Sequence, residues 1–198
     1  TILAKEFRGG VLVMTGANSA VGLRSMPVRY LFLDEVDGYP LDVEGEGDAI
    51  SLAEARTRTF ARRKIFIVST PTISGASAIE REYEASDQRR YFVPCPHCNH
   101  PQWLRFEQLR WDKGQPETAA YICESCDTAI SEHHKTWMLE RGEWRSMAQG
   151  KTAGFHLSSL YSPVGWRSWR DIAAAWEAAV NKESGSAAAI KTFKNTEL

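Results

Sequence analysis

Hydrophobic residues form several short and nearly continuous runs in the first part of the chain. These runs cover residues 11–15, 28–34 and 64–70. Uninterrupted apolar runs are typical of central strands in a parallel sheet, because helices cover both faces of such a sheet. Apolar residues from Ile50 to Phe60 recur at helical spacing and predict a helix over about residues 48–61. The pattern therefore predicts an α/β fold with a parallel sheet and flanking helices.

Two further helices are predicted from capping-box patterns, in which a serine is followed three residues later by an acid. Ser77 and Glu80 open a helix that runs to about Ser86. Ser168 and Asp171 precede a segment with apolar residues at helical spacing. Near residue 90 the composition changes, because all 4 cysteines and most of the 5 histidines lie between residues 95 and 134. This change indicates a second module.

The composition fits a globular chain of 198 residues, 43% hydrophobic and 11% aromatic, with one main core and a small satellite domain. No stretch approaches the apolar length of a membrane span, and the first residues lack the order of a signal peptide. We therefore expect a cytosolic protein with no membrane contact. The chain does not begin with Met and stops within an apolar-periodic segment, so we also expect an excised piece of a longer protein.

Charge is unevenly distributed, although the formal net charge is only -1. From Asp34 to Glu54 the charged residues are all acidic, and a run of bases follows from Arg56 to Lys64. A solvated loop and helix face explains this segregation as well as a functional surface does. The bases can meet phosphates, but the acidic run repels a duplex unless it faces Mg²⁺ or a neighbouring subunit. We therefore expect DNA contact to depend on assembly.

Two adjacent acids, Asp34 and Glu35, end the apolar run at residues 28–34. Open α/β sheets bind ligands beyond the carboxyl ends of their strands, where these acids are expected. In P-loop NTPases one acid holds Mg²⁺, and an adjacent glutamate in many motors polarises the attacking water. The next predicted strand ends in the hydroxyl-rich segment 68–72 at the same edge. The alternative interpretation is a strand that simply runs into an acidic turn.

A phosphate-binding loop of the form G-x-x-x-x-G-K-[ST] is absent from the sequence. Residues 150–152 read GKT, but Arg145 stands where the first glycine is required. The segment 15–25 contains glycine without lysine and is interpreted as a loop with a short helix. If the protein is an ATPase, we expect its phosphate loop upstream of Thr1.

The cysteines form two C-x-x-C pairs with 24 residues between them. The pairs are Cys95 with Cys98 and Cys123 with Cys126. Paired knuckles of this kind supply four thiolates for a tetrahedral zinc site, which is complete without His97 or His100. A closed site of this type stabilises a fold rather than catalysing a reaction. Disulfides and redox dithiols are the alternatives, which the missing signal peptide disfavours.

The segment 101–111 between the cysteine pairs interleaves aromatic and basic residues. It is interpreted as a β-hairpin. Such interleaving can serve nucleic-acid contact by stacking and charge, or the aromatic residues can simply pack. We favour packing.

Several motifs, taken in order, resemble the large terminase subunit of tailed bacteriophages in its lambda-like branch. They are LRSMPVRYLFLDEVDGYP, RRKIFIVSTPT, CPHC with CESC, GFHLSSLYSP and FKNTEL. Members of this family are ATP-driven motors that package viral DNA into a procapsid and cut it with a separate nuclease domain. The resemblance implies a partial P-loop ATPase of the ASCE type with a zinc-ribbon insertion. It divides the chain into half of an ATPase domain at 1–90, a zinc-ribbon module at 91–131 and a helical connector toward a nuclease domain at 132–198.

The resemblance also implies roles for individual residues. Asp34 holds Mg²⁺, Glu35 is the catalytic base for water, and Ser69, Thr70 and Thr72 belong to the motif that couples hydrolysis to movement. Arg24 is a further candidate for sensing nucleotide, although a surface arginine is the commoner explanation. The expected cofactors are structural zinc, and Mg²⁺ with ATP in the intact protein. Because the phosphate loop and the nuclease carboxylates are missing, the piece alone is expected to be inactive.

The partners implied by the resemblance are double-stranded DNA, the small terminase subunit, the portal of the procapsid and further copies of the same chain, in the cytoplasm of the bacterial host. Two other functions fit some of the motifs. A helicase-like ATPase also has an acidic motif like DEVD followed by one like STPT. A zinc-ribbon module that binds nucleic acid or acts as a scaffold, beside a decayed nucleotide domain, is the non-enzymatic alternative.

Overall fold

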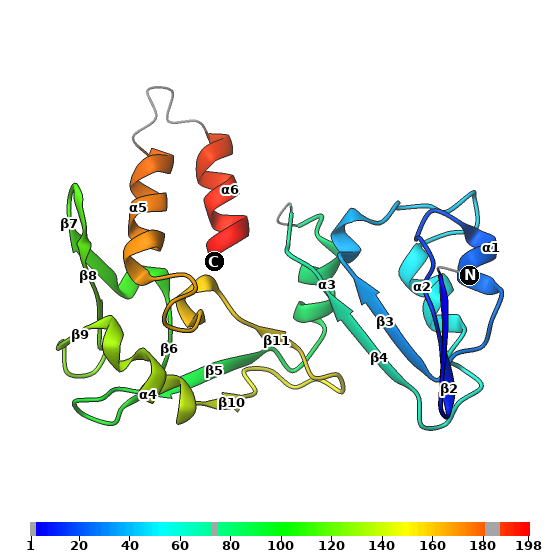
Figure 1. Ribbon diagram of the computed structural model, residues 1–198, viewed down its shortest axis with the longest axis horizontal. Coiled ribbons are helices and arrows are strands. Elements are labelled where there is room, and N and C mark those ends of the chain that lie inside the picture. Colours follow the sequence, from blue (N-terminus) through cyan, green and yellow to red (C-terminus); the bar gives the residue numbers. More distant parts are fainter. Residues whose placement is uncertain (1–2, 73–74, 181–186) are drawn as a thin grey trace. The chain divides into compact units, whose positions relative to one another are not determined.

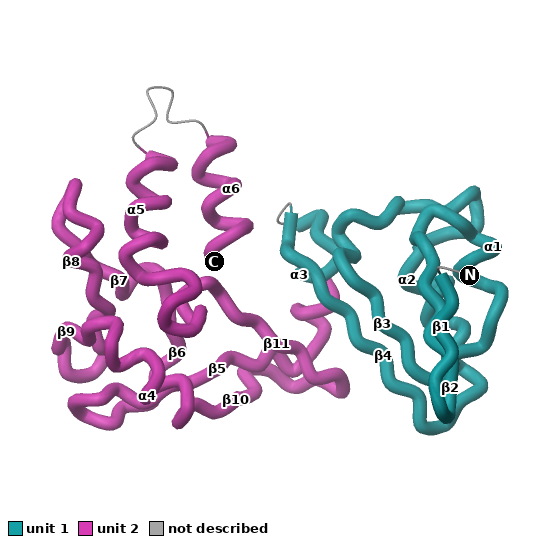
Figure 2. Tube along the Cα trace, in the orientation of Figure 1, with its two compact units in different colours: residues 1–80 teal, residues 81–198 magenta. Residues whose placement is uncertain are grey.

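The computed structural model describes residues 3–72, 75–180 and 187–198 and divides into two compact units. Unit 1 covers residues 1–80 and unit 2 covers residues 81–198 (Figure 2). Both units mix helices with small sheets, so the mixed α/β class predicted from the sequence is confirmed. No helix in the described ranges combines the length and the apolarity needed to span a bilayer.

The centre of unit 1 is a parallel pair of strands, β3 (Tyr30–Asp34) and β4 (Lys64–Val68) (Figure 1). The parallel pairing is the one predicted from the two apolar runs, and in it Tyr30 lies opposite Lys64 and Asp34 opposite Val68. Successive side chains of a strand point to opposite faces. One face of the pair packs with the core of unit 1, whereas Phe32 on the other face is 71% exposed. Within the described residues, therefore, only one face of this sheet is covered.

The prediction of a third parallel strand at residues 11–15 is wrong. This segment forms β2 (Gly10–Val13), which pairs antiparallel with β1 (Ala4–Phe7) in a separate hairpin. Gly9 in the connecting turn has φ +95°, a conformation that glycine adopts at low cost and that lets the chain reverse here. The apolar run indicated a strand correctly, but composition alone does not specify the pairing partner.

Side chains cap the first two helices of unit 1 at their amino ends. Ser19 caps α1 (Ala20–Arg24) and Asp48 caps α2 (Ala49–Ala55), each by accepting a backbone N–H. Helix α2 ends earlier than predicted, and the backbone then continues in turns, in the first of which the Thr57 N–H donates to the Glu54 carbonyl at 2.9 Å. A short 3₁₀ turn, η1 (Val36–Gly38), follows β3.

Helix α3 (Ala78–Glu84) begins in unit 1 and forms half of the predicted capping box. The Ser77 hydroxyl accepts the Glu80 backbone N–H at 3.1 Å. The Glu80 carboxylate accepts instead from the Gly75 N–H at 2.7 Å. The serine cap is therefore confirmed, whereas the acid closes the preceding turn.

Unit 2 is built around β5 (Arg89–Pro94) and a second, antiparallel sheet. Strand β5 pairs antiparallel with β6 (Pro101–Trp103) and β10 (Glu143–Arg145) and parallel with β11 (Phe155–His156). The second sheet contains β7 (Leu109–Asp112), β8 (Gln115–Ile122) and β9 (Ala129–Ile130). The helices are α4 (Lys135–Glu140), α5 (Trp169–Val180) and α6 (Ala187–Glu197), and the 3₁₀ turns are η2 (Phe106–Gln108), η3 (Glu132–His134) and η4 (Ser159–Tyr161).

The segment 101–111 does not form the predicted hairpin. Its first strand, β6, pairs with β5, and its second strand, β7, pairs with β8. The turn η2 separates them. The aromatic residues of the segment do pack, as favoured, because Phe106 lies 5.2 Å from Trp176 and from Phe193 between ring centroids.

Helix α5 carries the second predicted capping box in full. The Ser168 hydroxyl accepts the Asp171 N–H at 3.0 Å, and the Asp171 carboxylate accepts the Ser168 N–H at 3.1 Å. The helix then buries Trp169 and Ile172 in the core of unit 2 and lies beside α6 (Figure 1). The same core contains Cys95 and Cys123, so it joins the cysteine-containing part of the chain to helix α5.

Candidate functional site

The carboxylates Asp34 and Glu35 lie at the carboxyl edge of the parallel pair. Asp34 is the last residue of β3, and Ser69 directly follows Val68, the residue opposite Asp34. Because the strands are parallel, both ends reach the same edge of the sheet. Both acids are exposed. The structure thus brings the acidic and hydroxyl-rich segments together, as their positions in the sequence predicted.

Glu35 has a left-handed backbone conformation, with φ 55° and ψ 47°. A residue other than glycine in this region costs on the order of 1–3 kcal/mol, and it persists only where its surroundings fix it. Here the Gly38 N–H bonds to the Glu35 carbonyl at 2.9 Å, and the neighbouring Val36 is 2% exposed. Strain of this kind gathers at functional sites. Glu44 has the same φ of 55°, so it is the position of Glu35 at the carboxyl edge of the parallel pair that distinguishes it from the other acids of the run.

Asp37 is a site residue that the sequence reasoning missed. Its Oδ2 accepts from the Thr72 N–H and from the Thr72 hydroxyl, both at 2.9 Å, and its Oδ1 accepts from the Ile79 N–H at 2.9 Å. Burial alone raises the pKa of Asp37, but the hydrogen bonds from Ile79, Ser77 and Thr72 together hold it below its usual value. The signal in the sequence is the acid three positions after Asp34.

The hydroxyl-bearing residues after β4 lie around the turn η1. The Ser69 hydroxyl accepts the Asp37 N–H at 3.2 Å and lies 3.2 Å from the Thr70 carbonyl. Thr70 is exposed. Tyr39, just after η1, is partly buried, and this burial raises its pKa. The two segments therefore form one hydrogen-bonded edge.

Arg24 lies elsewhere in unit 1. Its guanidinium pairs with Glu46 at 2.6 Å, and its carbonyl accepts a hydrogen bond from Arg56. The Arg56 carbonyl in turn accepts from Val28, just before β3 begins. Arg24 is thus anchored toward the amino end of the strand that Asp34 terminates, and the structure does not bring it to the carboxylates. Glu46, one acid of the acidic run, is therefore engaged in an ion pair within unit 1.

The four cysteines of unit 2 form a second candidate site, a metal centre. Their Sγ atoms all lie within 4.8 Å of one another, with 3.9 Å between Cys95 and Cys126 and 3.7 Å between Cys98 and Cys123. Sulfur atoms of a tetrahedral site with metal–sulfur bonds of roughly 2.3 Å lie about 3.8 Å apart. All four thiols are free of disulfides. Four close cysteines with this spacing can hold a metal ion.

The two halves of the centre have the same local geometry. In the first, the His97 N–H donates to the Cys95 Sγ at 3.4 Å; in the second, the Ser125 N–H donates to the Cys123 Sγ at 3.4 Å. Each knuckle then turns through a left-handed residue, Asn99 or Asp127. Backbone N–H groups aimed at sulfur favour the thiolate form, which is the form that ligates metals.

The thiols differ in their ionisation without a metal. Burial raises the pKa of Cys95 to about 12, whereas hydrogen bonds from Thr128 lower the pKa of Cys126 to about 6. The histidines take no part in the cluster, since His100 pairs with Glu124 at 3.1 Å and His97 stacks edge-on with His134 at 5.6 Å.

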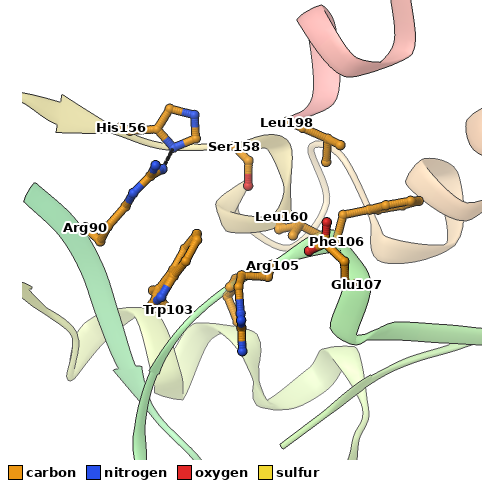
Figure 3. Close-up of a pocket in the computed structure, with 10 residues that line it drawn as sticks. Arg90, Trp103, Arg105, Phe106, Glu107, His156, Ser158, Leu160 and Leu198 are labelled. Atoms are coloured by element: carbon orange, nitrogen blue, oxygen red, sulfur yellow. Dashed lines mark hydrogen bonds between the residues drawn. The ribbon is translucent and has the colours of Figure 1, made fainter. Parts of the chain in front are cut away.

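A cavity in unit 2 lies beside Trp103 (Figure 3). The guanidinium of Arg90 lies 4.8 Å and that of Arg105 5.4 Å from the Trp103 ring, and Arg90 also bonds to His156. Arg105 pairs with Glu124 at 2.6 Å. The arginines and the tryptophan are therefore engaged with one another, which fits the packing interpretation of this segment.

Comparison with known proteins identifies the family. Residues 1–144 match the model "Phage terminase large subunit gpA, ATPase domain", and residues 152–198 match "Terminase large subunit gpA, endonuclease domain". The chain therefore belongs to the phage terminase large subunit family.

Two curated relatives match the whole chain. The terminase large subunit of Enterobacteria phage P21 is 30% identical over 224 residues, and that of Escherichia phage lambda is 27% identical over 226 residues. Both alignments cover 100% of this chain and 34% of the relative, so the chain spans about a third of the length of these proteins. No solved structure matches the chain.

Proposed function

We propose that this chain is part of the ATPase of a phage DNA-packaging motor, in which hydrolysis drives double-stranded DNA into a procapsid. Membership of the large terminase family supports a role in DNA packaging. The observation that carries the ATPase proposal is the parallel pair β3 and β4, with two acids and a hydroxyl-rich segment at one edge. A parallel sheet of the ASCE type, completed by further strands, is the architecture that we propose for the intact domain.

The acids at this edge take different roles in the proposal. Asp34 holds Mg²⁺, which neutralises charge on the transferred phosphoryl group. A single carboxylate is sufficient, because Mg²⁺ in nucleotide sites is shared with phosphates and water. Glu35, fixed in its left-handed conformation, orients the attacking water and accepts its proton. Ser69, Thr70 and Thr72 respond to the nucleotide and pass its state to the rest of the motor.

The cysteine centre is proposed to hold structural zinc. The thiolate donor set and the sulfur separations fit this metal, and the absence of an open ligand position fits a structural role. Cys95 and Cys123 belong to the core that also contains Trp169 and Ile172 of the nuclease-matched segment. The metal therefore stabilises both the ribbon and the start of that segment.

The domain roles and partners follow from the family. We propose that residues 1–90 belong to the ATPase domain, 91–131 form the zinc ribbon and 132–198 lead into the nuclease. The small terminase subunit, the portal and further copies of the large subunit are the proposed partners in the cytoplasm of the bacterial host. Arg24 remains a candidate nucleotide sensor, although its ion pair with Glu46 must open for that role.

The test is ATP hydrolysis by the full-length large subunit that carries this segment, measured with and without DNA. Glu35→Gln is expected to lower kcat by about 10²-fold or more, because the general base is lost, while ATP still binds. Glu6→Gln, which removes an exposed acid of β1, is the matched control and is expected to match the wild type. Turnover by Glu35→Gln at the wild-type rate would show that the base is assigned wrongly.

A further inference from the structure

Asp37 ties three elements of unit 1 together through one carboxylate. It lies in η1, two residues after Glu35, and binds Thr72 beyond β4 and Ile79 in the first turn of α3. These partners are 35 and 42 residues away in the sequence. The carboxylate thus joins the end of one strand, the segment after its parallel neighbour and the start of a helix.

The backbone of Asp37 makes a further hydrogen bond to the segment 69–72, this time as the donor. The Asp37 N–H donates to the Ser69 hydroxyl at 3.2 Å, while the Asp37 side chain accepts from Thr72. The turn η1 is therefore held against both ends of the segment 69–72. Because Asp37 donates to Ser69 and accepts from Thr72, the two contacts fix both the distance of η1 from the segment 69–72 and its position along that segment.

The same turn fixes the conformation of Glu35. The Gly38 N–H closes η1 onto the Glu35 carbonyl at 2.9 Å, and Glu35 is the left-handed residue that precedes the turn. A shift of segment 69–72 must therefore either break the bonds to Asp37 or move η1 and Glu35 with it. The Asp37 carboxylate is ionised at neutral pH, since its hydrogen bonds hold its pKa below the usual value, and bonds to an ionised acceptor are the stronger kind.

We propose that Asp37 is the positioning residue that links the hydroxyl-rich segment 69–72 to Glu35, so that a change at one is felt at the other. This inference rests on the proposed ATPase function of the same edge. It assigns Asp37 no contact with the nucleotide. Its role is to hold Glu35 where water is activated and to make that position depend on Thr72.

The test uses the full-length large subunit with Asp37→Asn, Thr72→Val and Thr72→Ser, together with Glu35→Gln. Asparagine keeps the size of the side chain but loses the ionised acceptor, and valine keeps the shape of threonine without its hydroxyl. Asp37→Asn and Thr72→Val are each expected to lower kcat by about tenfold with KM for ATP within about twofold, since misplacing a catalytic group affects turnover more than binding. Thr72→Ser, which restores the hydroxyl, is expected to restore kcat.

The double variant Asp37→Asn/Thr72→Val separates a shared contact from general weakening. If the Thr72 hydroxyl acts through the Asp37 carboxylate, the double variant loses about as much kcat as Asp37→Asn alone. Multiplication of the two losses, or failure of serine to restore the rate, would overturn the proposal. If Asp37→Asn does not fold, the proposal is tested by Thr72→Val and Thr72→Ser, of which the first should lower kcat and the second should keep it. Absence of ATP turnover in the wild type would remove the proposed function itself, and full turnover in Glu35→Gln would remove the assignment of the base. Inactive Glu35→Gln with fully active Asp37→Asn would remove only this inference.

Discussion

The sulfur atoms of Cys98 and Cys123 lie 3.7 Å apart, although the residues are 25 positions apart in the sequence. They belong to different knuckles, and each knuckle has the same local geometry, with a backbone N–H aimed at a cysteine sulfur and a left-handed residue in its turn. Cys95 and Cys123 are both fully buried in the core that includes the nuclease-matched helix α5. We therefore expect the binding of a metal by these cysteines to be coupled to the packing of this unit.

Cys123→Ser is expected to abolish stoichiometric zinc binding, because three thiolates and a neutral hydroxyl no longer complete the tetrahedral site. Unit 2 should lose about 3 kcal/mol or more of unfolding free energy, as expected for loss of a structural metal. Metal content by elemental analysis and urea denaturation measure the two effects. His100→Ala is the control and should keep the metal, since His100 pairs with Glu124 outside the cluster. Full zinc content in Cys123→Ser would contradict the assignment.

Lys135 is a fully buried cation that fastens α4 to the loop before α5. It pairs with Glu132 at 2.5 Å and donates to the Ser162 carbonyl at 3.1 Å and the Arg167 carbonyl at 3.4 Å. Burial lowers its pKa, and Glu132 partly opposes that shift. Lys135→Ala should cost about 3 kcal/mol of unfolding free energy, because it removes the cation that pairs with Glu132 and leaves two carbonyls without their donor, although Glu132 keeps the hydrogen bond from the Trp169 N–H.

The control for this change is Lys151→Ala, which removes an exposed lysine and should alter stability by less than about 0.5 kcal/mol. Urea denaturation followed by circular dichroism is the measurement. Equal stability of the two variants would show that the buried pair contributes nothing net.

His156 gives unit 2 a defined pH dependence. Burial, and then the adjacent Arg90 cation, lower its pKa to about 4 from the usual 6.5. The unfolded chain therefore binds more protons than the folded chain between these values, so stability falls as pH falls from about 6.5 to about 4. The loss attributable to this residue should be about 2 kcal/mol after allowing for its partial exposure.

His156→Gln removes this titration and should flatten the pH dependence over that window. The quantity to compare is the difference in unfolding free energy between pH 7 and pH 5, wild type minus variant. This difference cancels the acid sensitivity of the cysteine centre, which both proteins share. An identical pH dependence in both proteins would contradict a buried neutral histidine.

Local signals in the sequence predicted local structure well. The Ser168 and Asp171 capping box forms with both hydrogen bonds, because its partners are only three residues apart. The cysteine knuckles close for the same reason. The runs at 28–34 and 64–70 pair in parallel as predicted, with the helix α2 between them in the chain.

Pairing over longer distances was less predictable. The run at 11–15 is apolar enough for a central strand, but the chain reverses at Gly9, which has a positive φ, and the run pairs antiparallel with β1. The segment 101–111 has the composition of a hairpin, yet β6 pairs with β5 in one sheet and β7 pairs with β8 in another. Asp37 was missed because its role depends on Thr72 and Ile79, which the sequence places far away. Such contacts are set by tertiary packing, which composition and spacing do not encode.

Asp34 and Glu35, at the carboxyl end of β3, are proposed to carry out the ATP hydrolysis that drives DNA packaging. The most direct measurement is DNA packaged into procapsids, scored as nuclease-protected DNA, by full-length large subunit carrying wild-type sequence, Glu35→Gln or the control Glu6→Gln. We expect ATP-dependent protection of DNA from nuclease with the wild type and with Glu6→Gln. We expect no protected DNA with Glu35→Gln, although this variant still binds nucleotide. Packaging by Glu35→Gln at the wild-type rate would contradict this proposal.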